Sequence, residues 1–170
     1  MSSSIKRIND PPPSNPEPIS PEVISNIQRL ANRSLDAIYH YAVDQARYVF
    51  FNRRFRQIFG LQNSEHHGIE ADSLLKKIHP KDRKKLQDAY NITSAYGQDK
   101  GEVEYRLVKS DGSIRWLHDR WIAFEQDGNP AIEGFIRDIT EEKLAVEQFL
   151  DSKQNAPIGT FIVQDNKFKY

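Results

Sequence analysis

Histidines and carboxylates are the residues of this chain whose types could do chemistry. The 170 residues include five histidines and 24 acidic residues, but no cysteine. The lack of thiols excludes disulfides, thiolate metal sites, iron–sulfur clusters and cysteine nucleophiles. There is no glycine-rich phosphate loop, nucleophile elbow or histidine-glutamate zinc motif, and the acidic residues are scattered as on solvated faces. The sequence therefore predicts no enzyme in this segment.

The histidines are not spaced as a metal site. His66 and His67 are adjacent in a polar loop, but no third ligand is close in the sequence. His40 and His118 lie in segments with strand character, where a single histidine is more often hydrogen-bonded than metal-ligating. His79 directly precedes a predicted helix, and we expect it to help cap that helix. We therefore predict no metal site.

Charge and hydropathy limit the partners. The 24 basic and 24 acidic residues cancel, so no overall field favours nucleic acid or an anionic membrane. No run of about 18 apolar residues could span a membrane, and the N-terminus lacks the apolar core of a signal peptide. Together with the lack of cysteine, this composition predicts a cytoplasmic protein segment without nucleic-acid or membrane partners.

The elements that must position these side chains begin after a polar tail. Residues 1–20 are rich in proline, serine and charge, a composition that predicts a disordered tail. A helix is predicted over residues 21–34, with Ser20 as its cap and Pro21 at its first position. Its apolar residues, among them Val23, Ile27 and Leu30, form one stripe. We expect this amphipathic helix to pack on another surface.

Strand and helix patterns then alternate along the chain. The segments "LDAIYHYAVD" and "ARYVFFN" predict a hairpin, "RRFRQIFG" predicts a short helix, and "IHPKDRKKLQDAYNITSAYG" predicts a longer one. Three strands follow at 102–109, 114–126 and 131–139, joined by Asp-Gly turns. This order predicts an α+β domain with a five-stranded antiparallel sheet, whose helices are inserted between strands two and three and cover one face.

A second amphipathic helix is predicted after the last strand. Residues 141–155 form a linker helix with Thr140 as its cap, and the sequence returns to a strand pattern from residue 156 to residue 170.

The motifs in this order resemble those of PAS domains, the sensory modules of signalling proteins. Arg106, Trp116, Gly134, the two Asp-Gly turns and "RDITEEK" resemble the C-terminal (PAC) motif of that family. The segments "FFNRRFRQIFG" and "IHPKDR" resemble its upstream signatures. The resemblance implies a PAS domain over residues 35–140. "APIGTFIVQDNKFKY" resembles the start of a second, truncated PAS domain at 156–170, so we expect further domains downstream in the same chain.

The resemblance also bears on cofactors. The flavin photoreceptor branch of the family uses a cysteine, which is lacking here, and Leu107, Leu117 and Ile136 stand where its polar ring ligands align. The haem-binding branch places a histidine on the central helix, and residues 81–96 contain none. The resemblance therefore implies neither flavin nor haem, and leaves an unidentified small metabolite as the candidate ligand.

The resemblance assigns candidate residues to three sites. The side chains expected to face a pocket between helices and sheet are Tyr39, Tyr41, Tyr105, Leu107, Leu117, Asp119, Trp121 and Ile136. The opposite sheet face also carries large apolar groups, which predicts a cover. The candidates for helix packing or a homodimer contact are Val23, Ile27, Leu30, Trp116, Ile122 and Phe124. A signal is expected to leave the domain through Asp138, Ile139 and Thr140.

Two functions fit this sequence. The first is a sensory domain of a multidomain signal-transduction protein, which binds a small molecule or relays a signal to an output such as a histidine kinase or a cyclic-dinucleotide enzyme. The second is a cofactor-free interaction module that dimerises and spaces its neighbouring domains.

Overall fold

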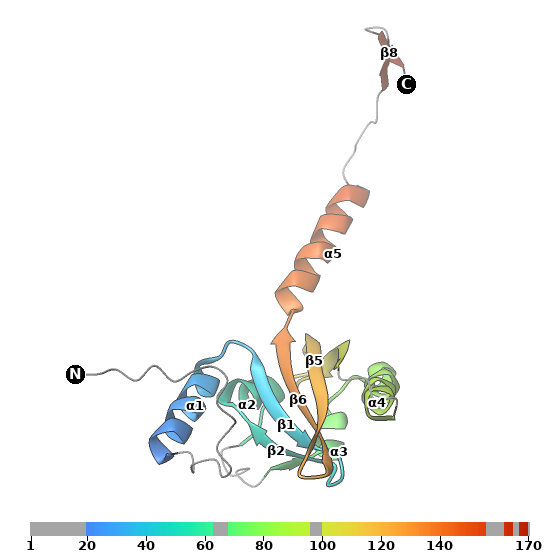
Figure 1. Cartoon of the computed structure of the whole chain (residues 1–170). Coiled ribbons are helices and arrows are strands. Elements are labelled where there is room, and N and C mark those ends of the chain that lie inside the picture. The colour runs from blue at the N-terminus through green and yellow to red at the C-terminus, as the bar shows by residue number, and fades with distance from the viewer. Residues whose placement is uncertain (1–19, 63–67, 96–99, 156–161, 165–166, 170) are drawn as a thin grey trace, which may run out of the picture.

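A single antiparallel sheet organises the domain (Figure 1). The computed structural model describes residues 20–62, 68–95, 100–155, 162–164 and 167–169. The elements in chain order are α1 (Pro21–Arg33), β1 (Ala37–Ala42), β2 (Arg47–Phe51), α2 (Arg53–Phe59), β3 (Ile69–Glu70), α3 (Ala71–Leu75), α4 (Pro80–Ala95), β4 (Lys100–Val108), β5 (Ile114–Gln126), β6 (Asn129–Asp138) and α5 (Thr140–Asn155). The predicted tail lies almost wholly outside the described residues.

The sheet has the strand order β3-β2-β1-β6-β5-β4, and each neighbouring pair is antiparallel. The α+β class and the helices between the second long strand and the third are therefore confirmed. The strand number differs from the five expected, because Ile69 and Glu70 add a short sixth strand beside β2. A two-residue strand carries no alternation of apolar and polar residues, so the sequence pattern does not reveal it.

The two Asp-Gly turns set the register of the three long strands. Gly112 and Gly128 both have a positive φ, near 80°, which a residue without a Cβ adopts without strain. In the resulting register Leu117, Asp119 and Trp121 of β5 point to one face, and Trp116, His118 and Arg120 point to the other. We call the first the inner face, because the helices cover it, and the second the outer face.

The core lies between the inner face and the helices α2, α3 and α4. Phe55 of α2 is fully buried and contacts the rings of Tyr39, Tyr48, Phe51 and Phe59. Such aromatic contacts add to the free energy gained from the buried apolar area. Leu74 of α3 and Leu86 of α4 complete the same core.

Asn52 joins three elements at one end of the core. Its side-chain oxygen accepts hydrogen bonds from the backbone N–H of Ile38 and of Phe55, each at 3.0 Å. Its amide donates to the carbonyl oxygens of Ala31, at 2.8 Å, and Asp36, at 3.0 Å. The side chain is 1% exposed, and these bonds satisfy both of its donors and its acceptor. Asn52 thus fixes the end of α1, the start of β1 and the N-terminus of α2.

The exposed edge of β4 is covered by other parts of the chain. His79 N–H donates to the Arg106 carbonyl and Val108 N–H donates to the Lys77 carbonyl, both at 2.8 Å. The Lys85 ammonium donates to the Glu104 carbonyl at 3.0 Å, and the backbone N–H of Arg106 donates to the Asp82 carboxylate at 2.9 Å. The backbone groups of β4 between Glu104 and Val108 that point away from β5 are therefore paired.

Asp82 and Arg106 attach α4 to this edge. The Arg106 guanidinium donates from Nε and Nη2 to the two carboxylate oxygens of Asp82, at 2.8 and 2.7 Å. A bidentate charge-assisted pair of this kind fixes both distance and orientation. The bonds from Arg106 lower the pKa of Asp82 to about 2. The His79 ring accepts a hydrogen bond from Lys81 N–H at 3.3 Å, so the predicted capping role of His79 is confirmed.

The terminal helices are less embedded. The Ser20 hydroxyl accepts a hydrogen bond from Val23 N–H at 3.3 Å, which confirms the predicted cap of α1. No residue of α1 is buried. Helix α5 extends away from the sheet (Figure 1). No helix among the described residues has the length and apolar character needed to cross a bilayer.

Residues 156–170 are described only in part. The backbone of Ile162–Gln164 pairs with that of Lys167–Lys169 as a separate antiparallel pair of strands. The other residues of this segment lie outside the described part of the chain, so a second PAS domain stays a prediction.

Candidate functional site

A buried carboxylate lies at the centre of the inner face. Asp119 of β5 is 0% exposed, and its two oxygens accept hydrogen bonds from the hydroxyls of Tyr39 of β1, at 3.0 Å, and Tyr90 of α4, at 2.9 Å. The Tyr105 hydroxyl, from β4, is a third side-chain partner. We call Asp119 and these three tyrosines the Asp119 cluster. The cluster connects three strands with the helix that covers them.

The environment of the cluster changes its acid–base chemistry. Burial raises the pKa of Asp119 to about 7, although the hydrogen bonds from the three phenols oppose this rise. Burial also raises the pKa of Tyr39, Tyr90 and Tyr105 well above the usual value for tyrosine. Around neutral pH the phenols therefore keep their protons, and Asp119 is the member of the cluster that titrates.

Two glycines make room for the large rings beside the cluster. Trp121 lies over Gly101 of β4, where an added Cβ would come within 2.4 Å of the indole. Tyr39 lies over Gly134 of β6, where an added Cβ would come within 2.3 Å of the phenol. Trp121 also meets the Tyr90 ring edge-on, at 4.6 Å between centroids. The indole therefore packs in the core, with 3% of its surface exposed.

The pocket residues expected from the sequence all lie on the inner face. Tyr39, Tyr105, Leu107, Leu117, Asp119, Trp121 and Ile136 are buried, and Tyr41 is half-buried with its ring stacked on Tyr90. The predicted strand phase is therefore correct. These side chains pack on one another and on the helices, and their binding of a metabolite stays a prediction.

Tyr90 and Asn52 are the residues of this region that the sequence analysis missed. Tyr90 follows Leu86 and Ala89 along α4 at a helical spacing, so an apolar stripe on that helix signalled its inward position. Asn52 directly precedes α2, where asparagine is a common N-cap. The remaining bonds of both residues depend on distant segments and have no local signal.

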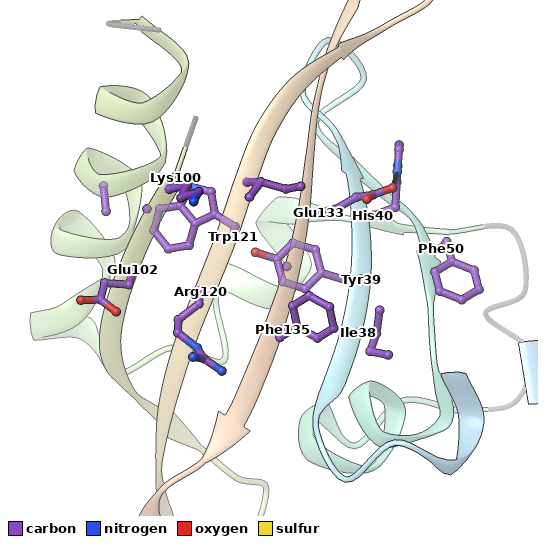
Figure 2. Close-up of a pocket in the computed structure, with 14 residues that line it drawn as sticks. Ile38, Tyr39, His40, Phe50, Lys100, Glu102, Arg120, Trp121, Glu133 and Phe135 are labelled. Atoms are coloured by element: carbon purple, nitrogen blue, oxygen red, sulfur yellow. Dashed lines mark hydrogen bonds and ion pairs between the residues drawn. The ribbon is translucent and has the colours of Figure 1, made fainter. Parts of the chain in front are cut away.

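An open groove is lined mainly by side chains of the outer face (Figure 2). Its lining combines exposed apolar side chains with paired charges, such as His40 and Glu133, whose Nδ1 and Oε1 lie 3.1 Å apart. Gly101 and Gly134, with the rings of Trp121 and Tyr39 that cover them, also border it. The other lining residues are Ile38, Phe50, Ala89, Lys100, Glu102, Arg120, Ile122 and Phe135.

The candidate residues for helix packing or a dimer contact differ in how far their side chains are exposed. Val23, Ile27 and Leu30 of α1 are exposed, as is Ile122 of the outer face, while Phe124 is half-buried. Trp116 is half-buried too, because the Arg106 guanidinium and the Lys143 ammonium lie over its ring at 5.3 and 5.4 Å. Within one chain the α1 stripe therefore does not cover the outer face, and Trp116 already packs against the root of α5.

The predicted relay residues connect β6 and α5 to β5. Ile139 N–H donates to the Trp116 carbonyl at 2.9 Å, and Trp116 N–H donates to the Thr140 hydroxyl oxygen at 3.0 Å. The Thr140 hydroxyl donates to Asp138, whose other oxygen accepts from Arg115 at 3.3 Å. The expectation that Thr140 caps α5 is wrong, because it is the first helical residue and its hydroxyl bonds to Asp138 and Trp116.

The histidines of the strands are hydrogen-bonded on the outer face. His40 pairs with Glu133, and His118 lies 3.3 Å from Glu102. Within the described ranges no three His, Asp or Glu side chains are grouped as metal ligands. His66 and His67 lie outside these ranges.

Comparisons with known proteins agree with this geometry. The family model described as PAS fold matches residues 48–136, which is more than half of the chain. No curated protein sequence matches it. A sensory box histidine kinase/response regulator from Burkholderia thailandensis has a similar structure, with a TM-score of 0.60, 23% identity, and coverage of 76% of this chain and 95% of that one.

Two further structures are similar. The N-terminal domain of a diguanylate cyclase with PAS/PAC sensor from Marinobacter aquaeolei has a TM-score of 0.56 and 18% identity, over 64% of this chain and 98% of that one. The PAS domain of a protein from Colwellia psychrerythraea has a TM-score of 0.56 and 20% identity, over 70% of this chain and 98% of that one. Because the family model matches more than half of the chain, over residues 48–136, the chain belongs to the PAS family.

Proposed function

We propose that this chain is a sensory relay module, in which a change between α4 and the inner face passes along β5 into α5 and on to an output domain. One observation carries the proposal: β5 holds Asp119 in the core and, three residues earlier, Trp116 at the root of α5. A strand is stiff along its length, so a displacement of Asp119 also displaces Trp116. The segment has no catalytic activity of its own in this proposal.

The root of α5 is well placed to receive such a shift. Besides the backbone bonds to Trp116, the Lys143 ammonium pairs with Glu104 of β4 at 2.6 Å. The first turn of α5 is therefore attached to two strands that also contribute to the Asp119 cluster. The output class, a histidine kinase or a cyclic-dinucleotide enzyme, is proposed from the similar structures. A cytoplasmic location belongs to the same proposal.

Hydrogen exchange of the whole chain tests the relay. Replacing Tyr105 with Phe removes one hydroxyl from the cluster and little volume, and we expect faster amide exchange in residues 139–144 than in the unchanged chain. The control is Arg120→Ala, which alters an exposed side chain on the outer face of β5. Equal exchange at the α5 root in both variants and the unchanged chain would contradict the relay.

A cofactor-free dimerisation module is the second candidate function. It is favoured by the large apolar side chains that one chain leaves exposed on α1 and on the outer face, and by a core in which aromatic side chains pack over both glycines. In this proposal a second copy covers the outer face, and helix α1 takes part in the contact.

A further inference from the structure

The Asp119 cluster has more oxygen–oxygen contacts than phenol protons. Asp119 is in contact with Tyr39, Tyr90 and Tyr105, and the hydroxyl oxygens of Tyr39 and Tyr90 lie 3.0 Å from each other. These are four hydrogen-bond contacts, whereas three phenols carry three protons. A proton on Asp119 supplies the fourth.

The position of that fourth proton follows from the geometry. Protonated Asp119 donates to the Tyr39 oxygen, Tyr39 donates to the Tyr90 oxygen, and Tyr90 donates back to the second oxygen of Asp119. The three groups then form a closed ring in which every contact contains one proton, and Tyr105 donates to the carboxyl from β4. Hydrogen bonds in such a ring strengthen one another.

Loss of the proton breaks this ring. Tyr39 and Tyr90 then both donate to the carboxylate, and their oxygens face each other at 3.0 Å with lone pairs only. Tyr39 belongs to β1 and Tyr90 to α4, so the repulsion acts between the sheet and the helix. The ionised carboxylate is also buried away from water, which makes any arrangement that admits water more favourable.

We propose that Asp119 is a proton sensor, and that release of one proton loosens the attachment of α4 to the sheet. The inference deepens the proposed relay, on which it rests, by naming the proton as the signal. Proton uptake closes the ring and holds α4; proton release opens it.

The groups that face Asp119 support a response near neutral pH. They are Tyr39 from β1, Tyr48 from β2, Tyr90 from α4 and Tyr105 from β4, all with a raised pKa. Among the residues that the structure describes, no lysine, arginine or histidine forms a hydrogen bond or ion pair with Asp119. The carboxyl therefore lacks a cation that would hold it ionised.

The sign of the effect follows from linkage. The closed state raises the pKa of Asp119 from 3.8 to about 7, and access of water returns it toward the lower value. Between these values the closed state binds the proton more tightly, so a rise in pH favours the opened state. The protection of α4 should fall by up to about tenfold per pH unit, the limit for one proton.

Hydrogen exchange of the 170-residue chain between pH 5 and pH 8 tests the proposal. After correction for intrinsic exchange, we expect protection of residues 80–91 to fall as the pH rises toward 7. Asp119→Asn should remove this dependence, because an amide does not titrate, while every histidine remains. Tyr41→Phe is the matched control, since Tyr41 stacks on Tyr90 and is not among the phenols that hydrogen-bond to Asp119, and it should keep the dependence.

Each other outcome has a defined meaning. A flat profile in the unchanged chain, or the same slope in Asp119→Asn, would overturn the proton sensor. If Asp119→Asn does not fold, the test is read in the unchanged chain. The carboxyl ¹³C shift of Asp119 supplies a readout without substitution, and a midpoint near 4 would refute the proposal. The relay experiment is read at α5 and at one pH, so a negative result for the proton sensor does not decide it.

Discussion

Asn52 and Asp119 are the two buried polar residues of the described core, and they are satisfied in different ways. Asn52 bonds only to backbone groups, which neither titrate nor rotate. Asp119 bonds to three phenols, whose protons can be redirected. The first arrangement is suited to holding elements in place, and the second to changing with conditions.

Replacing Asn52 with Ala should destabilise the fold by about 2 to 4 kcal/mol, because it leaves several buried backbone groups without partners. Urea unfolding measures the change. Asn32→Ala is the matched control: Asn32 is exposed and accepts one bond, from Arg53 N–H at 2.8 Å, so its loss should cost less than about 1 kcal/mol. Equal losses for the two variants would contradict the role assigned to Asn52.

The pairing of α4 with β4 is the main contact at the scale of elements. The bidentate bonds from Arg106 to Asp82 hold the start of α4 against the strand edge, and Leu86 and Tyr90 then follow along the inner side of the helix. The position of Tyr90 in the cluster therefore depends in part on the Asp82–Arg106 pair, which holds α4 about two turns before Tyr90.

The Asp82–Arg106 pair predicts a specific acid sensitivity. Arg106 lowers the pKa of Asp82 from 3.8 to about 2, so the pair stabilises the fold fully above about pH 4 and loses this effect as the pH falls toward 2. Asp82→Asn should lower the melting temperature at pH 7 by roughly 3 to 8 °C. The difference from the unchanged chain should vanish near pH 2.

Thermal unfolding from pH 2 to pH 7 checks this prediction. Asp88→Asn is the control, because Asp88 lies on the same helix and pairs with Lys84 in an exposed contact, which contributes little. A difference between Asp82→Asn and the unchanged chain that persists at pH 2 would show that the effect is not electrostatic.

The elements that the sequence predicts well are those with local causes. The Asp-Gly turns, the Ser20 cap and the alternation of β5 are each fixed by a few neighbouring residues, and the structure confirms them. The short strand β3 and the bulge of β2 beside His40 are set by contacts with distant strands. The same limit applies to the site: alternation placed Asp119 and Trp121 on the inner face, whereas the partnership of Asp119 with Tyr90, 29 residues away, depends on the packing of α4.

At the scale of the whole molecule, the outer face and α1 remain uncovered in one chain. Ile122 and Phe135 of the sheet are 45% and 50% exposed, and Ile27 and Leu30 of α1 are 57% and 66% exposed. Apolar surface of this kind is typical of a contact region. The proposed homodimer would bury it.

Charge at Ile27 or Leu30 tests that assembly. Ile27→Glu and Leu30→Glu should each raise the dimer dissociation constant by roughly tenfold or more, because the carboxylate would be desolvated in the contact. Ser25→Glu adds the same charge on the opposite side of α1 and should change it little. Sedimentation velocity over a range of protein concentrations gives the constants. An unchanged monomer–dimer profile in all three variants would exclude α1 from the contact.

The covered edge of β4 has a consequence for how copies of this chain can meet. A strand with free N–H and C=O groups invites another strand to join the sheet, which leads to fibres and precipitates. Here Lys77, His79, Asp82 and Lys85 already occupy those groups between Glu104 and Val108. Growth of the sheet past that stretch is blocked, so in the proposed homodimer two copies would meet through the outer face as a closed pair instead of an open-ended array.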